Sequence, residues 1–450
     1  MDIFRRSLGK PIHLLGASAD ISPKPRVRAK TDSTQARAVG SWGGSTEELR
    51  RQMKRRIQQS IVLLAMCVFA AYQVSPAWAQ TETVIDIDAS GTGTCVVKNN
   101  GSVWCVGGNE YGQLGDGATI DRALLTQVKG LPKSKAISVG DAHACAIDQR
   151  SRVWCWGRNQ QGQLGRGNLI PSTKPVLVAI TGRAVSIAAG FDHTCVVLSK
   201  GKIACWGGNS HGQLGDGTRI QRKKPVLVRT KEKATQTETG RWYSCATFRS
   251  GVVQCWGRNF GGQLGNQPVL ADGYNGPDEL LPVPVTDIGS AASVHLGGGT
   301  CALLRDASVR CWGYYWTEIA RELGEPAYVL WPSRVEGLGQ VLRITSSNGN
   351  GIADATCALE RSGTVKCWGD DSSPLVTPGV GQDNFFEDPL PPTDISLPGA
   401  AVLIASGKDH ACAYLASNEL WCWGTNWYGQ LGVPADQELT QYEPMRLAIP

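Results

Sequence analysis

Fourteen cysteines of this chain form seven pairs, and the two cysteines of every pair are ten positions apart. Successive pairs begin 50, 50, 50, 56, 56 and 55 residues apart, so the chain is a sevenfold repeat. A period near 50 residues indicates a propeller or a solenoid, in which each unit buries its apolar surface against its neighbours. The pairs are Cys95 and Cys105, Cys145 and Cys155, Cys195 and Cys205, Cys245 and Cys255, Cys301 and Cys311, Cys357 and Cys367, and Cys412 and Cys422.

Each repeat reads as four short strands joined by turns. In residues 183–232, apolar and β-branched runs are separated by the turn Ser199-Lys200-Gly201 and by a Gly-rich loop at residues 208–217. Both faces of the central hairpin are apolar, as expected of a sheet stacked between two others. Four strands in each of seven units predict an all-β fold of 28 strands.

The turn between the two cysteines falls at one fixed position in every repeat. Glycine and asparagine predominate there, which indicates a backbone with positive φ. Ser151 and Ala307 suit such a backbone less well, so their turns are expected to differ. The seven residues are Gly101, Ser151, Gly201, Gly251, Ala307, Gly363 and Asn418.

Hairpin pairing about residue 200 places Cys195 opposite Cys205, at a separation that a disulfide accepts. All seven pairs are therefore predicted to be disulfides; packed, reduced cysteines are the alternative. Zinc is disfavoured because ligands ten apart, with no second close pair, do not match a zinc spacing. No metal or cofactor is expected.

A secretory signal peptide is expected near the N-terminus. The apolar run 61–72 is too short to span a membrane, follows Lys54-Arg55-Arg56 and precedes an Ala-x-Ala site that ends at Ala79. The predicted divisions are 1–52 (an over-extended start at Met53, or a disordered tail), 53–79 (signal peptide) and 80–450 (repeats). The alternative is an uncleaved anchor; after cleavage no stable membrane span remains. Export places the chain in the cell envelope or the medium, where disulfides persist.

Charge argues against nucleic acid as a partner. Residues 1–79 hold 13 of the 45 Lys and Arg and 5 of the 39 Asp and Glu, which leaves 32 basic and 34 acidic residues in the repeats. The repeats carry no basic excess that would attract a phosphate backbone.

The run Cys-Trp-Gly-x-Asn-x-x-Gly-Gln-Leu-Gly resembles the repeat of the regulator of chromosome condensation family. It is intact at 155–165, 205–215, 255–265 and 422–432, carries Val106 in place of Trp in the first repeat, and is degraded in repeats five and six. The resemblance covers residues 84–450 and implies a seven-bladed β-propeller. Residues 84–87 match a first strand and residues 443–449 a fourth, so the two ends should meet and close the ring.

The resemblance also bears on function. The founding member promotes nucleotide exchange on a small nuclear GTPase and binds chromatin, and relatives include a secreted inhibitor of β-lactamases. A near-neutral, exported chain fits a protein-binding scaffold, monomeric and without catalysis. The alternatives are a secreted propeller enzyme acting on polysaccharide and, third, a role like GTPase nucleotide exchange.

Insertions at 266–288, 314–335 and 370–396 interrupt repeats four to six and carry aromatic residues beside acids. Such residues on irregular loops are typical of an interface, although they could equally pack locally. A calcium site at 370–371 is a weaker alternative. The predicted binding residues are Tyr314, Tyr315, Trp316, Trp331, Asp370, Asp371, Phe385 and Phe386.

No catalytic constellation is apparent in the sequence. His143, His193 and His410 recur two residues before a cysteine and are interpreted as scaffold. His211 occupies a variable loop position, and His295 lies outside the motif. The GQLGDG stretches lack the Lys-Ser/Thr of a phosphate loop and are interpreted as turns, which Asp116 and Asp216 are expected to stabilise.

Overall fold

The computed structural model describes residues 50, 51, 53, 54, 82–266, 276–314, 328–347, 355–370, 373–376, 390–434 and 440–450; the side chains of 314 and 328–331 are not included. The chain divides into two units, Met1–Gln80 and Thr81–Pro450. Nearly all of the predicted leader at 53–79 lies outside the described residues. Within the described part, no helix is long and apolar enough to cross a membrane.

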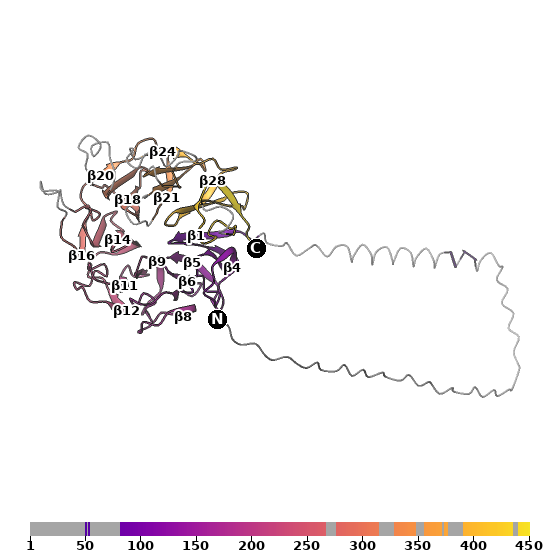
Figure 1. The fold of residues 1–450 in the computed structure, drawn as a ribbon, viewed down its shortest axis with the longest axis horizontal. Helices are drawn as coiled ribbons and strands as arrows, with labels where there is room; N and C mark the ends of the chain where they lie inside the picture. Colours follow the sequence, from indigo (N-terminus) through magenta and orange to yellow (C-terminus); the bar gives the residue numbers. More distant parts are fainter. Residues whose placement is uncertain are drawn as a thin grey trace, which may run out of the picture. The chain divides into compact units, whose positions relative to one another are not determined.

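Residues 84–447 form seven four-stranded antiparallel sheets arranged around a central axis (Figure 1). Each sheet is a blade built from four consecutive strands, and the chain runs from the innermost strand outward. The strands of blades one to four are β1 (Val84–Ser90), β2 (Gly93–Lys98), β3 (Val103–Gly107), β4 (Arg122–Gln127), β5 (Ser134–Val139), β6 (His143–Asp148), β7 (Val153–Gly157), β8 (Ser172–Leu177), β9 (Ala184–Ala189), β10 (His193–Leu198), β11 (Ile203–Gly207), β12 (Arg222–Leu227), β13 (Ala234–Thr239), β14 (Tyr243–Phe248), β15 (Val253–Gly257) and β16 (Glu279–Pro284). Those of blades five to seven are β17 (Ala291–Leu296), β18 (Gly299–Leu304), β19 (Val309–Tyr314), β20 (Tyr328–Arg334), β21 (Val341–Ser346), β22 (Ala355–Glu360), β23 (Val365–Gly369), β24 (Leu390–Asp394), β25 (Ala401–Ser406), β26 (His410–Leu415), β27 (Leu420–Thr425) and β28 (Thr440–Leu447).

The cysteine register is the predicted one. Cys195 in β10 lies directly opposite Cys205 in β11, and a disulfide joins them across 4.1 Å between Cα atoms. All seven pairs form such bridges, with Cα separations of 4.0–4.1 Å. The disulfide prediction is confirmed for every pair.

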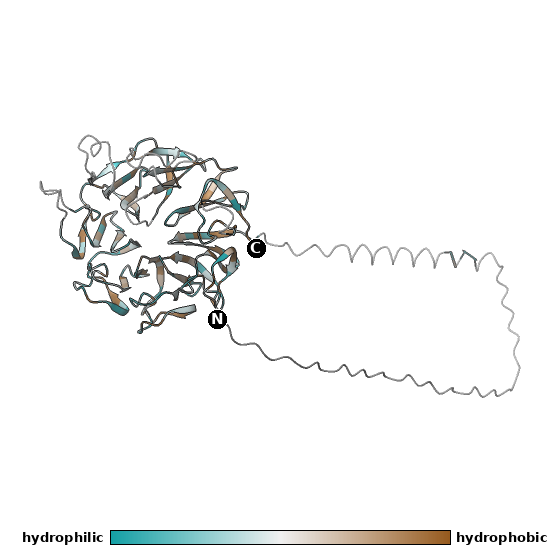
Figure 2. Ribbon diagram, viewed as in Figure 1, coloured by the Kyte–Doolittle hydropathy of each residue, from teal (hydrophilic) through white to brown (hydrophobic). Residues whose placement is uncertain are grey.

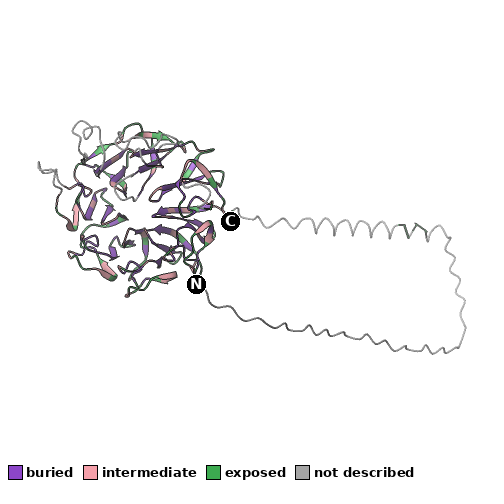
Figure 3. Cartoon of the chain, in the orientation of Figure 1, coloured by how far each residue is buried: buried purple, intermediate pink, exposed green. Residues whose placement is uncertain are grey.

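The core is a set of seven apolar layers, one between each pair of neighbouring blades. In blade three, Cys195 and Val197 pack against blade four, whereas Val196 and Trp206 pack against blade two. Apolar residues and buried residues therefore gather in the middle strands of the blades, while the outer strands are a mixture of half-buried and exposed residues (Figures 2 and 3). The predicted two-sided burial of each hairpin is confirmed.

The hairpin turns are alike in all seven blades, so the expectation that two of them would differ is wrong. Ser151 and Ala307 adopt φ of 63° and 67°, close to the 66° of Asn418 and to the glycines of the sister blades. The paired strands fix this conformation more strongly than the intrinsic preference of serine or alanine opposes it.

Replacing Ala307 by glycine is expected to stabilise the protein by about 0.5–1 kcal/mol. A non-glycine residue in the left-handed region is destabilised by roughly 1–2 kcal/mol, and glycine removes this strain. Glycine also raises the conformational entropy of the unfolded chain, but this offsets only part of the gain. Equilibrium denaturant unfolding would measure the change. The reverse substitution, Gly251→Ala, should destabilise, because its new Cβ would also clash with Ser290 Oγ. A lower unfolding midpoint for Ala307→Gly would contradict the argument.

The ring closes between blade seven and blade one, as predicted from the two chain ends. One apolar layer spans both blades. The Val84 amide donates to the Tyr414 hydroxyl at 3.1 Å, and Lys98, which pairs with Glu82 at 2.7 Å, also donates to the Pro450 carbonyl.

Candidate binding surfaces on the loop face and in the central cavity

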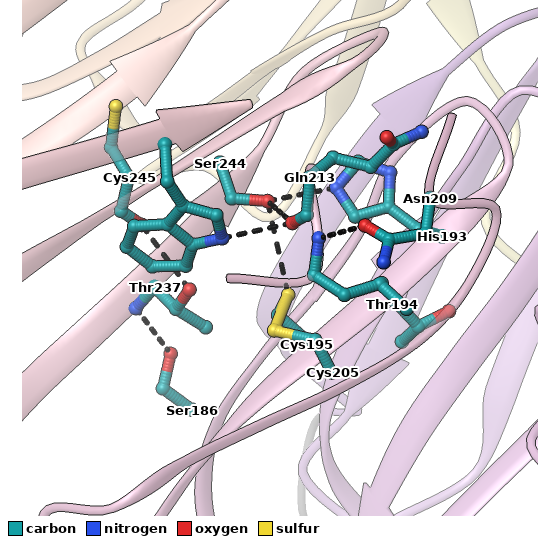
Figure 4. Close-up of a disulfide and its surroundings, with 12 residues drawn as sticks. Ser186, His193, Thr194, Cys195, Cys205, Asn209, Gln213, Thr237, Ser244 and Cys245 are labelled. Atoms are coloured by element: carbon teal, nitrogen blue, oxygen red, sulfur yellow. Dashed lines mark hydrogen bonds between the residues drawn. A yellow bond between two sulfur atoms is a disulfide. The ribbon is translucent and has the colours of Figure 1, made fainter. Parts of the chain in front are cut away.

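The repeated motif builds the loop that follows the third strand of a blade. In blade three, Asn209 Oδ1 accepts from the Leu214 amide at 3.0 Å (Figure 4). The Asn209 Nδ2 donates to the carbonyls of Thr218 and Ile220. Asp216 accepts from the Thr218 amide and forms a salt bridge with Arg222, as Asp116 does with Arg122. These loops are structural turns, and the predicted role of both aspartates is confirmed.

A hydrogen-bonded latch joins this loop of blade three to blade four. The Gln213 carbonyl accepts from Ser244 Oγ and from Trp256 Nε1, each at 2.9 Å, and His193 Nε2 lies 2.8 Å from the same Ser244 oxygen (Figure 4). Because the serine proton goes to the carbonyl, the histidine donates through Nε2. The other latches pair His143 with Thr194, Tyr243 with Thr300, and His410 with Thr94.

The scaffold interpretation of the three recurring histidines is confirmed. All three are completely buried, and burial lowers the pKa of His143 to about 3 and that of His410 to about 4, so both rings are neutral. At two of the blade interfaces, neither position of the histidine–hydroxyl pair holds a polar side chain. The equivalent positions hold Gly93 with Ala144, and Ala355 with Ala411.

We use the name loop face for the side of the ring on which the loops between first and second strands and between third and fourth strands lie together. His193 at the start of β10 faces Gly207 at the end of β11, which places both kinds of loop on that side. The three predicted insertions follow third strands and therefore leave the blades on the loop face.

Most of the predicted binding residues lie outside the described side chains. Asp370 is described and half-buried, directly after β23. Tyr314 and Trp331 are placed only as backbone in β19 and β20. The residues outside the described part are Tyr315, Trp316, Asp371, Phe385 and Phe386. The predicted interface on these insertions stays a prediction.

An arginine–aromatic cluster that sequence reasoning missed lies on the loop face of blades three and four. The Arg241 guanidinium stands 5.3 Å from the ring centre of Phe191 and 4.1 Å from that of Trp242. Arg258 lies 4.5 Å from the ring centre of the same indole and 5.2 Å from that of Phe260, which is 52% exposed. We define the cluster as Phe191, His211, Arg241, Trp242, Arg258 and Phe260.

Charged residues form ion pairs at the edge of the cluster. Asp278 pairs with His211 at 3.0 Å and with Arg219 at 2.7 Å, and although burial opposes it, these hydrogen bonds keep the pKa of Asp278 below its usual range. Burial and the nearby Arg241 lower the pKa of Arg258. Arg241 Nε is buried without a hydrogen-bond partner among the described residues. His211, interpreted as a variable surface position, is thus part of an ordered contact.

A second feature is a cavity of about 270 Å3 on the ring axis, lined mainly by the innermost strands. Asp88, Glu238, His295 and Arg343 line it, and Asp86 reaches Arg343 at 3.7 Å. The sequence-based conclusion that no cluster of carboxylates and histidine departs from the repeat pattern is therefore wrong. The two cavity acids and the histidine occupy equivalent positions of β1, β13 and β17, where the sister blades have Ser138, Ala188, Thr345 and Ala405.

The cavity has unusual electrostatics. Burial raises the pKa of Asp88 to about 7 and that of Glu238 to about 8; the charge of Asp86 adds to the first shift and that of Asp88 to the second. Burial and Arg343 lower the pKa of His295 to about 3, so this ring is neutral and its Nε2 lies 3.0 Å from Ser293 Oγ. In the part of the chain that is described, no three His, Cys, Asp or Glu side chains gather as metal ligands.

The fold defines the chain as a seven-bladed β-propeller. The sequence model of the regulator of chromosome condensation (RCC1) repeat matches residues 100–147, 151–197 and 200–247. A second model of the same repeat matches residues 84–113, 135–163, 184–213 and 401–430. Residues 84–247 and 401–430 therefore carry repeats of the regulator of chromosome condensation type.

Solved structures share the fold. Yeast RCC1 (Prp20) bound to Kap60 is 21% identical with a TM-score of 0.64, over 82% of this chain and 84% of that one. Prp20p of Saccharomyces cerevisiae, described with its binding to Gsp1p and histones, is 22% identical with a TM-score of 0.64, over 77% and 85%. Human WBSCR16 is 22% identical with a TM-score of 0.62, over 74% and 87%. No curated protein matches the chain in a sequence search.

Proposed function

We propose that this chain is an exported scaffold that binds a protein partner through the loop face, with the arginine–aromatic cluster at the centre of the contact. The observation that carries the proposal is the stack of Phe191, Arg241, Trp242, Arg258 and Phe260 on the surface. Tryptophan and arginine are enriched among the residues that dominate binding energy at protein interfaces.

The cluster is already ordered in the free protein. Stacking fixes the arginine side chains between aromatic rings, so less conformational entropy is lost when a partner binds. The guanidinium groups of Arg241 and Arg258 are charged donors, for which a carboxylate of the partner is a suitable acceptor.

Export is supported by the seven disulfides, because such bridges persist in an oxidising compartment. The related yeast structures carry the names of protein partners, namely Kap60, Gsp1p and histones. We therefore favour protein binding for this chain. A nuclear nucleotide-exchange role does not fit, because disulfides are rare in nuclear proteins.

The test is affinity capture with a matched pair of variants. The purified full chain, Arg241→Ala/Trp242→Ala and Arg152→Ala/Trp154→Ala would each be immobilised and exposed to envelope and culture-medium extracts. The control pair is also an arginine stacked on tryptophan, at 5.4 Å, but Arg152 lies at the hairpin end of blade two, opposite the loop face. We expect one partner to bind the wild type and the control, and to bind the cluster variant about 30-fold more weakly. Equal capture by all three proteins would refute the proposed surface.

The polysaccharide-enzyme alternative gains one observation, the acidic pair and histidine in the cavity. It predicts turnover of a polysaccharide that Glu238→Gln abolishes and Arg241→Ala/Trp242→Ala leaves intact. A binding scaffold shows no turnover with either variant.

A further inference from the structure

The cavity on the ring axis has more negative than positive groups. Two carboxylates, those of Asp88 and Glu238, and one guanidinium, that of Arg343, line it. Arg343 lies within ion-pair distance of Asp86. Among the described residues, no lysine or arginine forms an ion pair with Asp88 or with Glu238, so these two acids lack a directly paired counter-charge.

The hydrogen bonds of the two acids differ. Asp88 accepts from the backbone amides of Ala89 at 3.0 Å and Val139 at 2.7 Å, which holds its carboxylate in one orientation. Glu238 accepts only from Gln236 Nε2, at 2.8 Å, among the described residues. Glu238 therefore keeps acceptor capacity toward the cavity.

Two hydroxyl groups give an independent indication of a ligand. Thr239 and Ser406 also line the cavity, are 7% and 4% exposed, and their hydroxyl oxygens have no hydrogen-bond partner among the described residues. Buried polar groups are nearly always paired, so unpaired ones at a cavity wall call for an explanation.

We propose that the central cavity binds a small organic ammonium ion, with Asp88 and Glu238 as its counter-charges and the Thr239 and Ser406 hydroxyls as further acceptors. An ammonium group has three donors and no acceptor, which matches walls of carboxylate and hydroxyl oxygen. Among the described residues, no three His, Cys, Asp or Glu side chains gather in a way that would hold a metal ion. The site is separate from the loop-face cluster and independent of its proposed partner.

Binding of an ammonium ion in this cavity should release protons into the solvent. The other charged or titratable groups on the cavity wall are Arg343 and the neutral His295. Asp86 is not on the wall, but it pairs with Arg343 and its charge acts on Asp88. The remaining blades contribute only uncharged side chains at the positions equivalent to Asp88. Asp88 and Glu238 have pKa values raised to about 7 and about 8, so both are substantially protonated at pH 7. A bound cation favours their ionised forms, and binding at pH 7 should release about one proton.

Isothermal titration calorimetry of the purified full chain tests the proposal. The probe is 1,4-diaminobutane, and the neutral control of the same length is 1,4-butanediol. Titration at pH 7 in two buffers of different ionisation enthalpy gives the number of protons released, and needs no variant. Glu238→Gln removes one counter-charge and keeps an amide beside Gln236; Glu443→Gln, on the exposed outer strand β28, is the matched control.

We expect diamine binding with proton release, a dissociation constant weakened at least tenfold in Glu238→Gln, and no change in Glu443→Gln. Arg241→Ala/Trp242→Ala should bind the diamine like the wild type, which separates this site from the loop-face proposal. Absence of diamine binding, equal binding of the diol, binding without proton release, or binding of Ca2+ in place of the diamine would each overturn the inference. A thermal melt of each variant confirms that it is folded.

Discussion

Reduction of all seven disulfides is expected to unfold the ring at temperatures where the oxidised protein is fully folded. Each bridge closes a loop of about ten residues, and in the chain-entropy model that restriction of the unfolded chain stabilises the fold by roughly 2–3 kcal/mol. Seven such contributions would match or exceed the total stability of about 5–15 kcal/mol that is usual for a domain. The effect should be large even if each bridge delivers only half of its calculated share.

The experiment compares thermal midpoints of oxidised protein with protein that was unfolded, reduced and returned to native buffer with reductant present. Unfolding first is necessary because all fourteen sulfurs are buried. A single-pair variant, Cys195→Ala/Cys205→Ala, should lose about 2–5 kcal/mol and isolates one bridge from the other six. If the reduced protein refolded with an unchanged midpoint, the cysteines would act only as packed apolar residues.

Trp256→Ala is expected to lower the free energy of unfolding by about 3–5 kcal/mol, a loss at the upper end of what one substitution in a protein core causes. The indole is fully buried between blades three and four, and it packs against the disulfide of blade three. Its loss opens a cavity in a layer shared by two blades and removes one of the two donors to the Gln213 carbonyl. Denaturant unfolding would measure the change.

Two controls separate packing from hydrogen bonding. Trp256→Phe keeps most of the apolar contact, so it should cost about 1–2 kcal/mol, mainly for the lost hydrogen bond and the smaller ring. Trp154→Ala removes a half-buried indole that lies outside the layer and should cost less than Trp256→Ala. Equal losses at Trp154 and Trp256 would show that the blade interface contributes no special stability.

The fold could be predicted because its information is repeated along the chain. Cysteines ten apart require antiparallel neighbours, and seven copies of one four-strand unit define the blades and their number. The role of His193 also followed from repetition, since a residue that recurs at equivalent positions belongs to the scaffold. The shape of the Ser151 and Ala307 turns did not follow, because hairpin pairing overrides the preference of a single residue for negative φ.

The candidate sites could not be predicted because they depend on contacts across blades. Asp88 and Glu238 belong to blades one and four, and nothing local in the sequence shows that their strands face a common axis. Alignment of the seven innermost strands would have revealed them, since acids replace small or neutral residues at one position. The Arg241 stack needs Phe191 from the neighbouring blade, which the motif does not include.

Because every blade consists of four consecutive strands, no strand is exchanged between the first and the last blade. The backbone ends fall at a seam where His410 and Thr94 form the same latch that His193 and Ser244 form elsewhere. The first and last blades are thus joined in the same way as other neighbouring blades. A circularly permuted chain, joined from residue 450 to residue 82 by a short linker and opened between other blades, retains every sheet and every disulfide. The seams at Gly93 with Ala144 and at Ala355 with Ala411 lack the histidine–hydroxyl pair and keep only the indole hydrogen bonds of Trp156 and Trp423, so they are the preferred points at which to open it.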